Sequence, residues 1–136
     1  MEEYLKPIRD NIHLIKNLCE FLKTSLKVPT EPKISFIINK KNALNPLGKT
    51  AYYIPEEQKI CVYIVGRHLK DVGRSISHEW IHHAQHCNNQ IKKENNQEGY
   101  FLKDSDMVEL ERDAYERGNL IFREWEELVK AGKIKV

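Results

Sequence analysis

The sequence predicts an α+β domain in which three short strands separate an N-terminal helix from two C-terminal helices. Apolar residues recur at helical spacing near both ends of the chain, whereas β-branched and aromatic residues gather between residues 34 and 65. Proline, glycine and asparagine mark the boundaries between these segments. A chain of 136 residues can bury a core without disulfides, so we expect residues 1–136 to form a single domain.

The first element predicted is one amphipathic helix over residues 2–27, which Pro29 and Pro32 then interrupt. Its apolar stripe consists of Leu5, Ile8, Ile12, Ile15, Cys19, Leu22 and Leu26. A strand is expected at Ile34–Ile38, where the residues are β-branched or aromatic. Asn42–Lys49 contains an Asn-Pro pair and a glycine, and is expected to be a loop.

The other two strands are expected at Thr50–Ile54 and Lys59–Val65, with a turn over Pro55–Gln58. Strands joined by so short a turn pair in antiparallel fashion, so we expect a mainly antiparallel three-stranded sheet.

Two helices follow the sheet. The first is predicted from Leu69 or Val72 to about Cys87, and the second from about Ser105 to Lys130, where Gly132 ends it. The polar segment Asn88–Lys103 joins them and is too long for an ordinary connection, so we expect a loop that covers a binding site.

Composition excludes several classes of function. The net charge is +2 with both signs interspersed, which predicts neither a nucleic-acid nor a membrane partner. No apolar run has the length of a membrane span, and the acidic N-terminus does not resemble a signal peptide. The three cysteines form no C-x-x-C pair and are odd in number, which is typical of a reducing compartment. We therefore expect a cytoplasmic protein.

The most informative feature is an H-E-x-x-H motif at His78, Glu79 and His82. Two histidines four residues apart on a helix lie one turn apart on the same face, so both rings can reach one zinc ion. In this motif the glutamate acts on a water molecule as general base. Helical phase places His86 on the same stripe and His83 on the apolar face, where we expect a hydrogen-bonded core histidine.

A catalytic zinc requires a third protein ligand. The extended motif with Gly and His at positions 85 and 88 is absent, because the chain has Gln85 and Asn88. The open alternatives are His86, which lies about 12 Å from His78 along one straight helix, and the glutamates Glu109 and Glu111.

Helical phase distinguishes the two glutamates. Relative to Gly118, Glu111 falls in the centre of the apolar stripe of the last helix, whereas Glu109 falls on the opposite side. A buried carboxylate needs an ion or a charged partner, so we expect Glu111 to be buried and to be the third ligand. A salt bridge to a lysine or arginine is the alternative interpretation of Glu111.

These residues resemble a known pattern. His78-Glu79-x-x-His82 followed by Glu111-x-x-Ala114 is similar to the gluzincin zinc metallopeptidases, and the segment at residues 111–115 with Gly118 is similar to their E-x-x-A-D/N segment. The strand pair at residues 51–54 and 59–64 is similar to the pair that precedes the motif helix in those families. The size and element order of the chain are most similar to those of the minigluzincins. Tyr115 departs from the pattern, since many relatives carry Asp or Asn there to support a histidine ligand.

The resemblance, which covers residues 33–125, implies a zincin-like fold and a zinc-dependent metallopeptidase that cleaves a peptide or protein substrate. It implies that His78, His82 and Glu111 hold Zn²⁺ and that Glu79 activates water. An edge strand of the sheet would bind the substrate as an added strand.

Three residues are candidates for the donor that stabilises the oxyanion or contacts substrate, namely His86, Tyr100 and Tyr115. We also expect Tyr100 or Phe101 to cover the cleft, unless these residues only anchor the start of the last helix.

Other classes of function remain open. The chain could be a latent or non-catalytic zinc-binding module with a regulatory or interaction role, a domain with a purely structural zinc that His86 completes, or a metal-free interaction domain.

Overall fold

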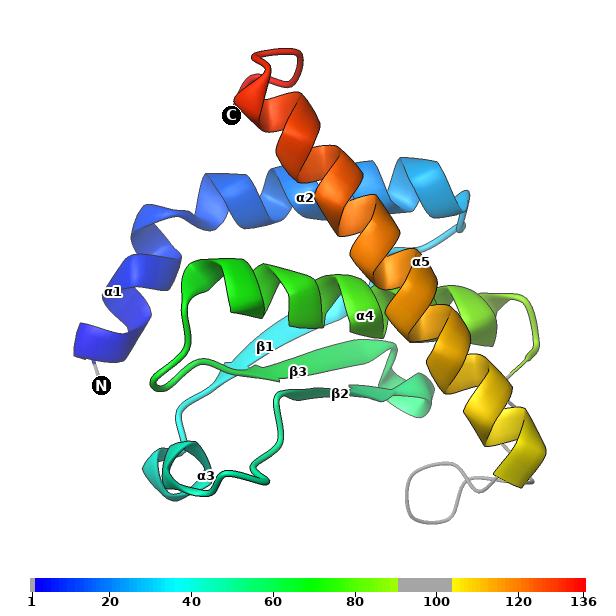
Figure 1. Ribbon diagram of the computed structural model, residues 1–136, viewed down its shortest axis with the longest axis horizontal. Helices are drawn as coiled ribbons and strands as arrows, with labels where there is room; N and C mark the ends of the chain where they lie inside the picture. Colours follow the sequence, from blue (N-terminus) through cyan, green and yellow to red (C-terminus); the bar gives the residue numbers. More distant parts are fainter. Residues whose placement is uncertain (1, 91–103) are drawn as a thin grey trace.

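A computed structural model describes residues 2–90 and 104–136 of the chain. Over these residues the fold contains five α-helices, one short 3₁₀ helix and a three-stranded sheet (Figure 1). The elements are α1 (Glu2–Asp10), α2 (Ile12–Leu26), β1 (Lys33–Ile37), α3 (Lys40–Leu44), β2 (Ala51–Ile54), η1 (Pro55–Glu57), β3 (Lys59–Tyr63), α4 (Leu69–Cys87) and α5 (Asp104–Lys130). The predicted α+β class is confirmed, and the bounds of α4 and α5 agree with the prediction within one residue.

The N-terminal segment forms two helices, so the prediction of one continuous helix was wrong. Proline at position 7 lies inside α1, and the break follows one turn later at Asn11. The Asn11 backbone N–H donates to Ile8 O at 3.2 Å, while the Asn11 side chain donates to Pro7 O at 2.8 Å. An asparagine side chain therefore replaces a helical backbone bond, and the chain changes direction between α1 and α2 (Figure 1).

The sheet is mixed, which corrects the expectation of a mainly antiparallel sheet. The strand order is β1-β3-β2; β3 pairs with β2 in antiparallel fashion and with β1 in parallel fashion. The connection after β1 leads to the opposite edge of the sheet, where β2 lies. The next strand, β3, then occupies the central position between β2 and β1. This connection contains α3, in a segment predicted mostly as loop, and Asn39 caps α3 by accepting from Asn42 N at 3.0 Å.

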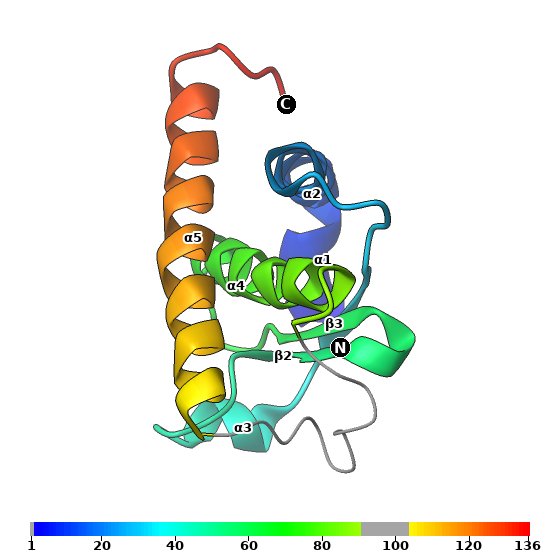
Figure 2. The same ribbon diagram turned by 90° about the vertical axis from the view of Figure 1, so that its right-hand side faces the viewer.

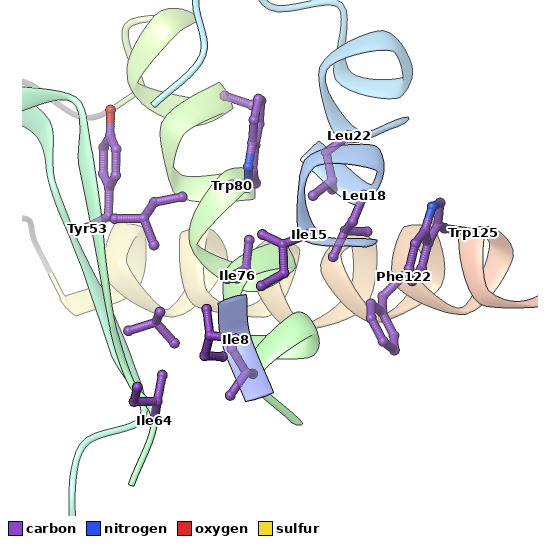
Figure 3. Packing of buried hydrophobic residues seen from close by; sticks show 14 of the residues in the cluster. Ile8, Ile15, Leu18, Leu22, Tyr53, Ile64, Ile76, Trp80, Phe122 and Trp125 are labelled. Carbon is purple, nitrogen blue, oxygen red and sulfur yellow. The ribbon is translucent and has the colours of Figure 1, made fainter. Parts of the chain in front are cut away.

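Helix α4 lies in the middle of the molecule, between the sheet and α2, and α5 crosses both helices on one side (Figures 1 and 2). The central strand β3 contributes the fully buried Ile60 and Val62 to the layer against α4. Trp80 of α4 packs on the α2 side of the helix, near Leu22 (Figure 3). Because α4 is covered on two faces, polar groups on its remaining stripe lie beside α5.

No helix among the described residues combines the length and the apolar character that a membrane span requires.

The crossing of α4 and α5 is close because α5 has a glycine at the contact. A Cβ atom at Gly118 would lie 3.1 Å from His78 Cα and 3.2 Å from His78 N, which is tighter than ordinary contacts. The neighbour is helix backbone, which cannot rotate away as a side chain can. Gly118 therefore sets how near α5 approaches the histidine-bearing turn of α4.

We predict that Gly118→Ala destabilises the protein. An alanine in a helix interior normally gains about 1 kcal/mol over glycine, but overpacking at this crossing costs about 1–3 kcal/mol. The free energy of unfolding in urea should therefore fall, by up to about 2 kcal/mol. The control is Leu120→Ala, two residues away and 64% exposed, with an expected change of about 0.5 kcal/mol or less. Equal or greater stability of Gly118→Ala would show that the contact is not limiting.

Candidate metal centre

Local sequence explains how α4 presents its polar stripe. Gly66 adopts a left-handed conformation with φ 70° after β3, and the His68 side chain caps α4 by accepting from Lys70 N at 3.2 Å. The buried Ile76 and Trp80 then fix the rotation of the helix in the core. That rotation directs His78 and His82, one turn apart, toward α5.

Three predicted site residues converge at the α4–α5 crossing. Ligand-type atoms of His78, His82 and Glu111 all lie within 4.8 Å of one another. His82 Nε2 is 2.5 Å from one Glu111 carboxylate oxygen, and His78 Nε2 is 3.6 Å from the other. Within residues 2–90 and 104–136, this is the group of histidine, cysteine and acidic side chains that could hold a metal ion.

The prediction that Glu111 would be buried was wrong. Its side chain is 47% exposed, because it lies at the edge of the helix crossing with one side open to solvent. Helical phase nevertheless distinguished the two glutamates correctly, since Glu109 is 72% exposed and pairs with Arg112 at 3.6 Å, away from the histidines. The alternative interpretation of Glu111 as the partner of a lysine or arginine is not observed among the described residues, where its ion pairs are with His78 and His82.

The charges of Glu111 and the neighbouring histidines shift the pKa values of Glu111 and His82. The imidazoles of His78 and His82 hold the pKa of the Glu111 carboxyl far below its usual range. Burial alone would lower the pKa of His82, but the hydrogen bond to Glu111 and the nearby Glu79 raise it above its ordinary value. Without a metal ion, Glu111 is therefore an anion. It attracts positive charge to the position between the rings of His78 and His82.

Glu79 is the second carboxylate at this position. Its side chain is buried, with 7% of the residue exposed, and it lines the same cleft as the cluster. Burial raises the pKa of Glu79, and the positive potential of His82 and His78 opposes that effect. A carboxylate with this environment is able to accept a proton from a neighbouring group.

The cluster lies in the wall of an open cleft with a volume of about 700 Å³. The cleft runs between the segment that leads into β2, one stripe of α4 and the facing side of α5. Its lining residues are Gly48, Lys49, Thr50, Ala51, Tyr52, Tyr53, Arg67, Asp71, Arg74, Ser75, His78, Glu79, His82, Glu111, Tyr115 and Asn119. An extended molecule could therefore reach the cluster along β2.

A series of hydrogen bonds behind His82 was not predicted from the sequence. His82 Nδ1 lies 2.8 Å from Gln85 Oε1, and Gln85 Nε2 donates to Leu110 O and to Asp113 Oδ2, each at 2.9 Å. Arg117 donates to both oxygens of Asp113 at 2.6 and 2.8 Å, and lowers the pKa of that carboxyl. Sequence reasoning used Gln85 only to exclude the extended motif, although a glutamine three residues after a ligand histidine lies on the same side of the helix.

His83 is a hydrogen-bonded core histidine, as predicted. It is fully buried, with Nε2 2.9 Å from Thr30 O and Nδ1 2.8 Å from Tyr53 Oη. Because Thr30 O can only accept, Nε2 carries the proton and Tyr53 donates to Nδ1. Burial lowers the pKa of His83, so the ring is held neutral.

The remaining candidate residues are distributed unequally. Tyr115 lines the cleft and its ring packs edge-on against His78, with centroids 4.6 Å apart. His86 lies beside Tyr53, with Nδ1 3.2 Å from the hydroxyl, and is not among the described residues that line the cleft. Tyr100 and Phe101, with the loop predicted around them, lie outside the described residues.

Comparison of the chain with protein-family models, curated proteins and solved structures gave no significant match in any of the three. The geometry of the cluster and the sequence motif are therefore the observations that bear on function.

Proposed function

We propose that this protein is a zinc metallopeptidase of the gluzincin type with a zincin-like fold, and that it hydrolyses peptide bonds of a peptide or protein substrate. The observation that carries the proposal is the convergence of His78, His82 and Glu111 within 4.8 Å in the wall of an open cleft, beside the buried Glu79. Motif spacing alone does not require a glutamate from a helix more than twenty residues later to meet both histidines.

The donor set fits zinc. Two imidazole nitrogens and a carboxylate oxygen are the ligands of catalytic zinc sites such as His₂Glu, which keep one position open. Structural zinc sites have four protein ligands and are closed. Among the described residues the group has three members, His86 is not one of them, and the cleft reaches the group from solvent. These features favour catalysis over a structural zinc completed by His86.

The reaction follows from the positions of the two carboxylates. When bound by His78, His82 and Glu111, zinc polarises a carbonyl group and lowers the pKa of a water molecule toward neutrality. Glu79 lines the cleft next to these residues and takes the proton of the water that adds to the peptide carbonyl carbon. As the C–N bond breaks, Glu79 returns the proton to the leaving amine.

Substrate orientation is supported by the sheet topology. Among the strands of residues 2–90 and 104–136, β2 is an edge strand that pairs with β3 on one side, and its residues line the cleft. An unpaired strand edge offers backbone donors and acceptors to an extended peptide. Of the three candidate donors for the oxyanion, Tyr115 is the one that the structure describes in the cleft wall, and we assign that role to it.

The proposal also includes a cytoplasmic location, which the absence of disulfides among Cys19, Cys61 and Cys87 supports. The alternative function is a latent or non-catalytic zinc-binding module with a regulatory role, and turnover distinguishes it from an active peptidase.

Substitutions in the motif should separate metal binding from turnover. His78→Ala and His82→Ala should each lose zinc measured by metal analysis after gel filtration, because each removes a ligand. Glu79→Gln should retain zinc and lose cleavage of a mixed peptide library by at least about 10²-fold, because it removes the general base. Loss of zinc from Glu79→Gln to the same degree as from the histidine variants would contradict this assignment. Wild-type protein that binds zinc without cleaving any peptide would favour the non-catalytic alternative.

The two glutamates of α5 provide a matched pair of variants. Glu111→Gln should weaken zinc binding by at least about 10–100-fold, since even a residue outside the ligand sphere has an effect of that size. Glu109→Gln makes the same chemical change on the same helix, and should leave the zinc dissociation constant unchanged because Glu109 lies away from both histidines. The measurement is competition with a chromogenic chelator. Weaker binding by Glu109→Gln than by Glu111→Gln would identify Glu109 as the ligand.

A further inference from the structure

The chemistry around Gln85 fixes the orientation of its side-chain amide. Gln85 is fully buried, and its Nε2 lies 2.9 Å from two groups, Leu110 O and Asp113 Oδ2. A backbone carbonyl and an ionised carboxylate can only accept hydrogen bonds, so the NH₂ group must point at them. The amide oxygen is therefore the atom that lies 2.8 Å from His82 Nδ1.

This orientation determines the proton on His82. An amide oxygen has no hydrogen to donate, so His82 Nδ1 must carry the proton that joins the two groups. The other ring nitrogen, Nε2, is the one directed at Glu111. We propose that Gln85 is a positioning residue, which keeps His82 protonated at Nδ1 and thereby reserves Nε2 for the metal ion. The proposal rests on the proposed function only in naming zinc as that ion.

Gln85 also contacts the turn of α5 that carries Glu111. Its two acceptors, Leu110 O and Asp113, come from the same turn of α5 and flank Glu111 in sequence. One buried amide thus connects the ring of a ligand on α4 to the backbone that carries the ligand on α5. Arg117 holds Asp113 through two hydrogen bonds, so the acceptor is itself fixed in place.

Gln85 supports a histidine ligand by a hydrogen bond, a role for which the sequence resemblance identifies no residue in this chain. Many of the peptidases that the sequence resembles carry Asp or Asn at the position of Tyr115 to support a histidine, but here the Tyr115 ring packs edge-on against His78 and the residue is 61% exposed. The support for His82 comes instead from its own helix, three residues further on.

A merely structural role for Gln85, as a link between α4 and α5, predicts different results from a positioning role. A link affects the free energy of unfolding but not the affinity of folded protein for zinc. A positioning residue affects zinc affinity and the ring proton of His82, and both effects can be measured without any peptide substrate.

The test uses two variants of the full chain. Gln85→Met keeps the length of the side chain and removes its hydrogen bonds. Ser77→Ala is the matched control, because it removes a different buried hydrogen bond of α4, the one to Gly73 O at 3.0 Å.

Two quantities are measured, the dissociation constant for Zn²⁺ by chelator competition and the ring ¹⁵N–¹H signals of His82 by NMR with and without zinc. We expect Gln85→Met to weaken zinc binding by about 10–100-fold and to lose the slowly exchanging Nδ1–H signal. Ser77→Ala should change neither quantity.

Wild-type zinc affinity and an intact Nδ1–H signal in Gln85→Met would overturn the proposal. Equal losses in Ser77→Ala would also overturn it, because they would reflect stability alone. Wild-type protein that binds no zinc would contradict the proposed function instead. In that case the ring signals of the zinc-free proteins still decide whether Gln85 holds the proton on Nδ1.

Discussion

The crossing of α4 and α5 is the contact on which the candidate site depends. Two imidazoles come from one helix and the carboxylate from the other, so the cluster exists only while the helices remain at this separation. Gly118 permits the approach next to His78, and the Gln85 amide joins the helices behind His82. The contact also gathers two carboxylates, Glu79 and Glu111, near the same point, an arrangement that a bound cation would stabilise.

Much of the fold could be predicted from local sequence, because periodicity and turn residues act over short distances. The apolar stripes of α4 and α5 predicted the positions of both helices. Gly132, with φ 73°, lies in the turn that follows α5, as expected. The parallel pairing of β1 with β3 could not be predicted, since strand order depends on how the connection crosses the sheet. The break at Asn11 depends on one side-chain hydrogen bond that periodicity does not register.

The candidate site could likewise be predicted from the sequence only in part. Spacing on one helix predicts that His78 and His82 share a side, and helical phase selects Glu111 over Glu109. Phase could not give the exposure of Glu111, because that depends on how much of α5 extends past the edge of α4. The links from Gln85 to Asp113 and from His83 to Thr30 join residues far apart in sequence, so they required the three-dimensional arrangement.

The most direct test of the account is a crystal structure of the zinc-loaded protein with anomalous diffraction recorded at the zinc edge. We expect one strong anomalous peak about 2.0–2.2 Å from His78 Nε2, His82 Nε2 and a Glu111 carboxylate oxygen. Glu79 should lie near the peak without coordinating it, and the remaining position should open on the cleft. A peak coordinated by His86 or Glu109 in place of Glu111, or a closed site with four protein ligands, would contradict the central claim.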